Sequence, residues 1–325
     1  FQTQAFVDIR EVDDADGRYR ALHDSLGGRG IPDIHMGMQN IVLKELYAAL
    51  SDLATPEFFI AVKTLTAARG AQPASARILA RKTIAAIGDK AIAFYATCDK
   101  FIEGNYGAGA IPGIKGRARG TGFEVAKRHL TRTLSRLCNP RAAWFFGGAM
   151  ANRLSTGHGL AVCAAAAAIL DGLRDVAGTE RPGETALSLV GIWDLDRKIQ
   201  ECVAQATGAT GITSAPANLD AIRVFTALMP LRDSTKRKYG KDLPRIYAAV
   251  LANPSAKNAI EAHVWDGIEW FNKEKAEALV DAVALAAWAT RAGWAIGIAR
   301  GRRKAFATIA ASEYKITGIP TGDGR

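Results

Sequence analysis

The sequence contains little cysteine and little histidine, with four residues of the first type and five of the second among 325. Cys98, Cys138, Cys163 and Cys202 lie far apart and form no CxxC pair. Because structural zinc sites need closely spaced ligand pairs, the sequence predicts no metal site. Cysteines scattered through helical and alanine-rich segments are typical of small buried side chains. We therefore expect all four to be reduced and the protein to be cytoplasmic.

Long apolar runs are also missing, which argues against a membrane protein. The window 159–170 is too short to span a bilayer, and the longer window 276–299 carries Glu277, Asp281 and Arg291. Charges are costly at bilayer depth, so both windows favour buried helices and no membrane partner. The first residues, FQTQAFVDIREV, show no signal-peptide pattern, and a start at an internal-looking phenylalanine is typical of a piece of a longer protein.

Acidic residues are fewer than basic ones, 32 against 42, which gives a net charge of +10 and a pI near 9.5. Such an excess favours anionic partners, although an ordinary basic surface is the simpler alternative. The hydrophobic fraction of 49% and the charged fraction of 23% are those of a globular protein. A chain of this length forms one large domain or two of ordinary size.

Alternating strand patterns are nearly absent. Only 5–12 alternates between apolar and polar residues, which predicts one short N-terminal strand. Helical spacing and caps predict helices over 18–26, 33–53, 56–68, 74–102, 123–137, 159–176, 185–206, 218–228, 244–252, 255–263, 273–299 and 302–312. The sequence therefore predicts a mostly α fold, a multi-helix globular bundle with at most one short N-terminal strand.

A glycine-rich segment, 104–122, interrupts the predicted helices. Its sequence, GNYGAGAIPGIKGRARGTG, cannot form a core, and we predict a mobile loop or linker there. This segment separates an N-terminal helical part, 1–103, from the main helical part, 123–325.

Signatures of cofactor binding and catalysis are missing as well. No GxxxxGK[ST] motif occurs, and the glycines of 104–122 follow no strand, so we predict no cofactor. His158 lies in the segment STGHG, but no carboxylate is placed in the sequence to orient it, and a helix entry is the alternative. Asp194 and Asp196 would point apart on a helix, which favours a role at the helix start. The catalytic residues stay unassigned.

Basic residues cluster at 115–119, 236–241 and 300–304. The candidate anion-binding residues are Lys236, Arg237, Lys238, Arg302, Arg303 and Lys304. The segment KRKYGK joins charge to an aromatic ring, a combination suited to phosphate contact and base stacking, although a solvated turn is the alternative. No nucleic-acid module motif accompanies these clusters, so only non-specific polyanion binding is expected.

The densest aromatic cluster is HVWDGIEWFNKEKAEALV, in which Trp265, Trp270 and Phe271 fall within seven residues ahead of a helix. Two interpretations are open. Large aromatic rings are usually buried, which favours packing on the following helix. Alternatively, the rings are exposed and contact a carbohydrate or a partner protein.

The order of these landmarks resembles the C-terminal, mostly helical region of large bacterial proteins of the α-amylase family, glycoside hydrolase family 13. The similar pieces are FVDIREV with RYRALHDSLGGRGIPDIHMGMQNIVLKELY, then IWDLDRKIQECV with AIRVFTALMPLRD, and finally HVWDGIEWFNKEKAEALV. Within the last piece, residues 271–274 are the most specific. The resemblance covers residues 1–60 and 190–290.

The chain departs from that family in its catalytic part. Hydrolysis in the family depends on carboxylates carried by a (β/α)8 barrel, but this sequence has no alternating βα pattern, and no Asp follows Arg223 in the family's manner. The resemblance therefore implies a non-catalytic helical module with a structural or docking role, whose partner is the catalytic part of a larger protein or a glycan. The alternative is a free-standing basic helical protein that binds nucleic acid or belongs to a nucleoprotein assembly.

We expect trypsin to cut the native protein first at Lys115, Arg117 or Arg119. Glycine loses the most conformational entropy on ordering, and the segment has few apolar side chains to offset that cost. Brief digestion followed by mass spectrometry of the fragments locates the first cuts. Early cleavage elsewhere, with these three sites intact, would contradict the prediction.

Overall fold

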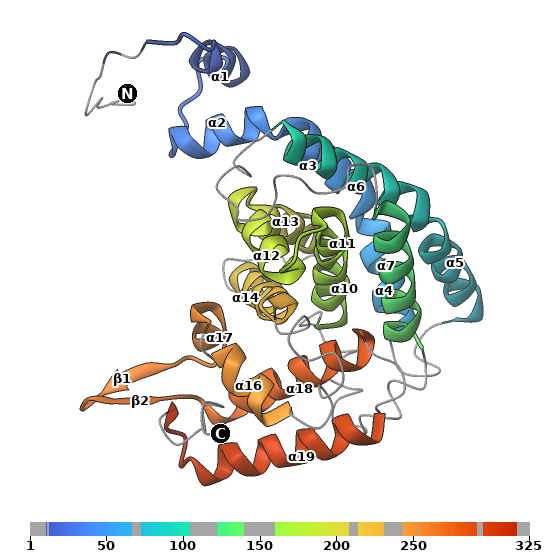
Figure 1. Cartoon of the computed structure of the whole chain (residues 1–325), viewed down its shortest axis with the longest axis vertical. Helices are drawn as coiled ribbons and strands as arrows, with labels where there is room; N and C mark the ends of the chain where they lie inside the picture. The colour runs from blue at the N-terminus through green and yellow to red at the C-terminus, as the bar shows by residue number, and fades with distance from the viewer. Residues whose placement is uncertain are drawn as a thin grey trace.

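Helices make up most of the described residues in the computed structural model, which confirms the predicted mostly α class (Figure 1). It describes residues 11, 13–66, 73–104, 122–139, 160–207, 214–230, 243–251, 253–290 and 295–316. Most of the predicted strand at 5–12 and of the glycine-rich segment lies outside these ranges, and so do His158 and the cluster of Lys236, Arg237 and Lys238.

The first half of the chain forms seven of the described helices. They are α1 (Arg18–Leu26), α2 (Ile34–Val42), α3 (Lys44–Leu53), α4 (Pro56–Thr66), α5 (Ala74–Ala85), α6 (Ile87–Glu103) and α7 (Phe123–Leu137). Asp33 caps α2, because its carboxylate accepts hydrogen bonds from the backbone N–H groups of His35 and Met36 at 2.8 and 3.2 Å. The predicted helix 33–53 is interrupted at Leu43, and the predicted helix 74–102 is interrupted at Ala86.

The second half forms α10 (Leu160–Asp171), α11 (Leu173–Ala177), α12 (Pro182–Ile192), α13 (Leu195–Thr207), α14 (Ser214–Thr226), α16 (Leu243–Leu251), α17 (Pro254–Ala259), α18 (Lys273–Thr290) and α19 (Ala295–Ala311). Three more predicted helices, at 159–176, 185–206 and 273–299, are each split in two. Each break allows the two halves of a predicted helix to contact different neighbours. In the predicted helix 74–102, for example, α6 packs on α3 and α7, whereas α5 packs mainly on α4. Similarly, α19 folds back onto α18, which one continuous helix cannot do.

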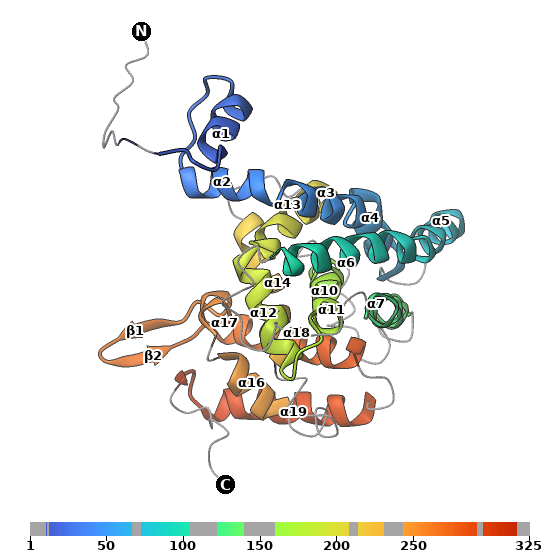
Figure 2. The ribbon, with the colours of Figure 1, turned by 45° about the horizontal axis from the view of Figure 1, so that its top comes forward.

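Helix α10 lies at the centre of the fold, surrounded by α4, α7, α12, α13, α14 and α18 (Figures 1 and 2). It is apolar on all sides, and nearly every residue from Ala161 to Leu170 is buried. A helix with that character must be covered all round, and its alanines allow the neighbouring helices to approach closely. The buried core is continuous from Leu43 to Ile309, so it includes residues from both sides of the 104–122 segment. The division at that segment stays a prediction.

Two buried tyrosines donate hydrogen bonds to backbone carbonyls near the breaks between helices. Tyr95 donates a hydrogen bond from its hydroxyl to the carbonyl oxygen of Ile169 at 2.9 Å, in the last turn of α10. Tyr47 donates in the same way to the carbonyl of Trp193, between α12 and α13, at 2.9 Å. Burial raises the pKa of Tyr47 to about 12, so its hydroxyl keeps the proton that it donates. At Gly172 a Cβ atom would lie 2.1 Å from the Tyr95 hydroxyl oxygen, so only glycine fits beside that ring.

The structure contains a β-hairpin that the sequence analysis missed. Strands β1 (His263–Trp265) and β2 (Ile268–Trp270) pair antiparallel, with Val264 opposite Glu269. Asp266 and Gly267 connect them with positive φ angles of 51° and 73°, as a tight type I′ turn requires. The expectations of no strand beyond residue 12 and of a helix reaching residue 263 are therefore wrong.

Replacing each of three buried tyrosines by phenylalanine tests the role of these hydroxyls. We expect Tyr47→Phe and Tyr95→Phe each to lower the free energy of unfolding by about 1 kcal/mol or more, because a buried carbonyl loses a donor. Tyr247→Phe should be neutral or stabilising, since the Tyr247 hydroxyl has no hydrogen-bond partner in the described structure. Urea denaturation followed by circular dichroism compares the three. A Tyr247→Phe variant that is the least stable would show the assignment of partners to be wrong.

Candidate functional site

The β1–β2 hairpin extends away from the helical body and is the clearest candidate for a functional site (Figures 1 and 2). Val264 and Trp265, adjacent on β1, are 71% and 68% exposed. Successive residues of a strand point to opposite faces, so Val264 and Trp265 present apolar side chains on opposite faces of the hairpin. The expectation that Trp265 packs on the following helix is wrong. Exposed apolar side chains grouped in this way are typical of a binding surface.

The base of the hairpin is attached to the helical body. Phe271 is only 4% exposed, and its ring meets the ring of Tyr314 edge-on, with centroids 6.2 Å apart. Its backbone N–H donates to the carbonyl of Tyr314 at 3.0 Å, and Trp270 forms a β-bridge with Lys315. Phe271 is thus an anchor whose ring is not accessible to a ligand, whereas the sequence analysis grouped it with the contact residues.

Ion pairs hold the flanks of the hairpin. Lys257 of α17 donates to both carboxylate oxygens of Glu269 at 2.7 and 2.9 Å. Glu261, just before β1, pairs with Lys275 of α18, and the hydrogen bond from that lysine lowers the pKa of the Glu261 carboxyl. These contacts join the hairpin to the two helices that flank it in sequence, so its direction relative to the body is defined.

The two indole rings of the hairpin differ in accessibility. The ammonium group of Lys315 lies 5.2 Å from the centre of the Trp270 ring, and that ring is partly buried. Its Nε1–H points to the carbonyl of Trp265 at 3.4 Å. Trp265 makes no ring contact with the described residues. Of the predicted contact residues, Trp265 is therefore the one whose ring is open to a partner.

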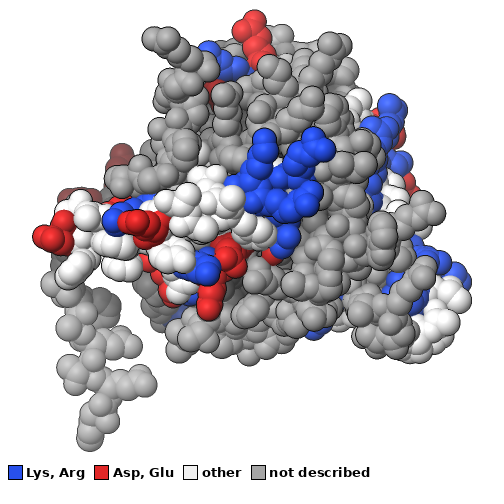
Figure 3. All heavy atoms as spheres, turned by 90° about the horizontal axis from the view of Figure 1, so that it is seen from below, with Lys and Arg blue, Asp and Glu red and all other residues white. Residues whose placement is uncertain are grey.

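The predicted anion-binding residues of α19 divide into two groups. Arg302 donates from Nε to Asp281 of α18 at 2.5 Å, and its guanidinium lies 4.4 Å from the centre of the Phe306 ring. Asp281 is only 1% exposed, so Arg302 serves the interface between α18 and α19. Arg303 and Lys304 are exposed, and Arg300, omitted from the predicted set, is exposed beside them. A cluster of basic side chains occupies this side of the molecule (Figure 3).

The two aspartates near the start of α13 face different partners, as the sequence analysis expected. Asp194 pairs with Arg197 of the same helix, whereas Asp196 pairs with Arg223 of α14 at 2.5 Å. They do not form a shared carboxylate site. Their role is to fix the start of α13 and its contact with α14.

A histidine–carboxylate pair was not predicted. His129 of α7 and Asp175 of α11 lie 2.7 Å apart, between Nδ1 and Oδ2. A carboxylate that orients a histidine is one part of a catalytic triad, but the pair equally well ties α7 to α11. Nothing in the sequence relates two residues so far apart, and the residues around His158 lie outside the described ranges.

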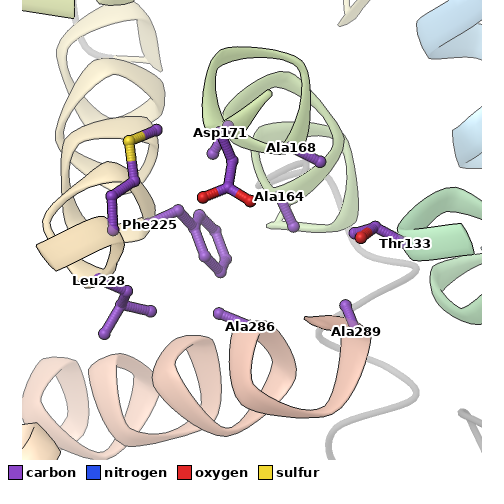
Figure 4. A pocket seen from close by; sticks show the side chains of 10 residues that line it. Thr133, Ala164, Ala168, Asp171, Phe225, Leu228, Ala286 and Ala289 are labelled. Carbon is purple, nitrogen blue, oxygen red and sulfur yellow. The ribbon is translucent and has the colours of Figure 1, made fainter. Parts of the chain in front are cut away.

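An internal cavity lies between α7, α10, α14 and α18 (Figure 4). Alanines line half of it, and Phe225, Leu228 and the carboxylate of Asp171 are among the other lining groups. Its volume of about 40 Å³ suits roughly one water molecule, whereas sites for small organic ligands enclose several hundred Å³. The cavity is therefore a packing defect among small side chains, not a substrate pocket.

Three further observations bear on the predicted classes. The four cysteines are all free, which confirms that they form no disulfide. In the described ranges, no group of three or more histidine, cysteine or carboxylate side chains is arranged to hold a metal ion. Within the same ranges, every helix is too short or too polar to cross a bilayer.

Comparison with known proteins assigns no family to the chain. The sequence matches no protein-family model. No curated protein and no solved structure is significantly similar to it. The fold and the site thus define a helical body with a projecting aromatic hairpin, and the resemblance to the α-amylase family stays a prediction.

Truncating Phe271 and Trp265 to alanine should affect stability very differently. Phe271→Ala removes a buried anchor and should lower the free energy of unfolding by about 3–5 kcal/mol. Trp265→Ala removes an exposed ring and should change it by less than about 0.5 kcal/mol. Thermal or urea unfolding measures both. Equal losses would mean that the Trp265 ring is packed in solution.

Proposed function

We propose that this chain is a non-catalytic helical module that docks a glycan through the β1–β2 hairpin. The observation that carries the proposal is the exposure of Trp265, 68%, on a hairpin whose base is anchored. An exposed indole ring is unfavourable in water unless a partner covers it. A hairpin whose base is already anchored loses less conformational entropy when a ligand binds.

The chemistry of an indole suits a sugar ring. The face of the indole carries partial negative charge, and the axial C–H groups of a pyranose carry partial positive charge, so the two surfaces attract when stacked. The stack also removes two apolar faces from water. Ile268, which pairs directly opposite Trp265 and is partly exposed, offers an apolar contact on the same face of the hairpin.

The proposed link to a glycan-active enzyme rests on the resemblance of segments such as 271–274 to the helical region of α-amylase-family proteins. The described ranges hold two short strands, so a (β/α)8 barrel is not among them. We propose that the catalytic carboxylates belong to another part of a larger protein, which would be the partner of this module. The free cysteines support placing it in the cytoplasm.

Affinity for α-glucans tests the proposal. We expect maltoheptaose or soluble starch to quench the tryptophan fluorescence and to retard the protein in affinity electrophoresis. Trp265→Ala should weaken binding about tenfold or more, because a central aromatic contact carries much of the energy of a small interface. The release of reducing sugar, measured in the same samples, should stay at background.

Tyr19→Ala provides a matched control, because Tyr19 is another exposed aromatic residue, 40% exposed, on the distant helix α1. It should leave glycan binding unchanged, and circular dichroism should show both variants folded. The proposal fails if neither glucan binds, or if the two variants bind equally well. Sugar release that survives repurification would overturn the non-catalytic assignment.

A further inference from the structure

Helix α19 carries a basic face that is separate from the hairpin. Arg300, Arg303 and Lys304 are exposed, and their spacing of three and four residues places them on one side of the helix. They span about 6 Å along the axis, from the helical rise of about 1.5 Å per residue. No carboxylate in the described part of the chain pairs with any of them.

The rotation of α19 about its axis is set by the opposite side of the helix. Ala305 and Ile309 are buried against the core, and Arg302 lies on their side, where it pairs with the buried Asp281. This pair and the apolar contacts leave the other side of the helix facing solvent. The packing of α19 therefore keeps the three cations on the side of the helix that faces solvent.

We propose that this face binds the phosphate backbone of a nucleic acid. The chain has a net charge of +10, so a polyanion is attracted from a distance, and three adjacent cations can replace the counterions of neighbouring phosphates. No base-reading element accompanies them, so the binding is non-specific and depends on salt. The proposal does not rest on the glycan-binding hairpin.

The side chains next to the cations favour a phosphate polymer over an anionic membrane. Among the residues of α19 whose burial the structure describes, the others exposed along this face are Ala307, Ala310 and Ala311, which are small. Helices that lie on membranes insert large apolar side chains, but the apolar side of α19 is used by the core. A nucleic acid backbone, which presents charged phosphates and needs no apolar insertion, therefore matches this face better than a membrane does.

Fluorescence anisotropy with a labelled oligothymidylate about 20 nucleotides long tests the proposal. We expect a Kd in the range of about 10⁻⁶ to 10⁻⁴ M in low salt. Because about three phosphates are contacted, the logarithm of the association constant should fall with the logarithm of salt concentration with a slope of about −2. Replacing Arg300, Arg303 and Lys304 together by glutamine, a good helix former, should weaken binding about tenfold and reduce the slope towards zero.

The matched control replaces Arg81, Lys82 and Lys90 by glutamine. These residues are equally exposed on α5 and α6, so the control removes the same net charge from a different surface. It should retain most of the affinity, and circular dichroism with thermal unfolding should show both variants folded. If the triple α19 variant does not fold, Arg303→Gln alone should still weaken binding by about two- to threefold.

Three outcomes would overturn the proposal. The first is the absence of binding in about 50 mM salt, where electrostatic contacts are strong. The second is an equal loss of affinity in the α19 variant and in the control, which would mean that only the net charge matters. The third is binding to vesicles of mixed phosphatidylserine and phosphatidylcholine without binding to the oligonucleotide, which would identify a membrane surface instead.

Discussion

The packing of this protein depends on hydrogen bonds to the backbone carbonyls where one helix ends and the next begins. A helix leaves its last carbonyls without partners inside the helix, and in a buried break water is not there to replace them. Leaving one such group unsatisfied costs about 1–3 kcal/mol, a large part of the roughly 5–15 kcal/mol that stabilises a typical domain. Tyr47 donates in this way to the carbonyl of Trp193, and Tyr95 adds a second donor to the carbonyl of Ile169, which also accepts from the Gly172 N–H at 3.3 Å.

These hydroxyls also connect helices that are distant in the sequence. Tyr95 belongs to α6 and reaches the end of α10, whereas Tyr47 belongs to α3 and reaches the junction of α12 and α13. The N-terminal helices are thereby joined to the central, alanine-rich α10 and to the helices around it. Because α10 has no polar face, neighbouring helices must cover it on all sides, and a small cavity lies beside its Asp171.

Helix content could be predicted from the sequence because periodicity and caps are local. Asp33 as a cap, and Phe123–Leu137 as a helix, follow from residues within a few positions. The breaks could not be predicted in this way, since they depend on which helix each half contacts. The break at Ala86 reflects the different neighbours of α5 and α6.

In the candidate sites, too, features set by neighbouring residues could be predicted, whereas contacts between residues distant in the sequence could not. Asp266–Gly267 between two short alternating segments is a local hairpin signal, and it could have identified the exposed indole of Trp265. The spacing of Arg302, Ala305 and Ile309 likewise assigns Arg302 to the apolar side of its helix. In contrast, the pair of His129 and Asp175 and the anchoring of Phe271 on Tyr314 join residues distant in the sequence.

The attachment of the hairpin to Tyr314 and Lys315 has a consequence for the order in which the protein is made. A chain emerging from the ribosome exposes Trp265 and Trp270 before Tyr314 and Lys315 emerge. Until then β2 lacks its bridge and Phe271 lacks its aromatic neighbour. Domains usually acquire structure from the N-terminal end during synthesis, and a two-stranded hairpin alone is only marginally stable. The projecting hairpin is thus a late product of translation, completed only after α18 and α19 have emerged and packed together.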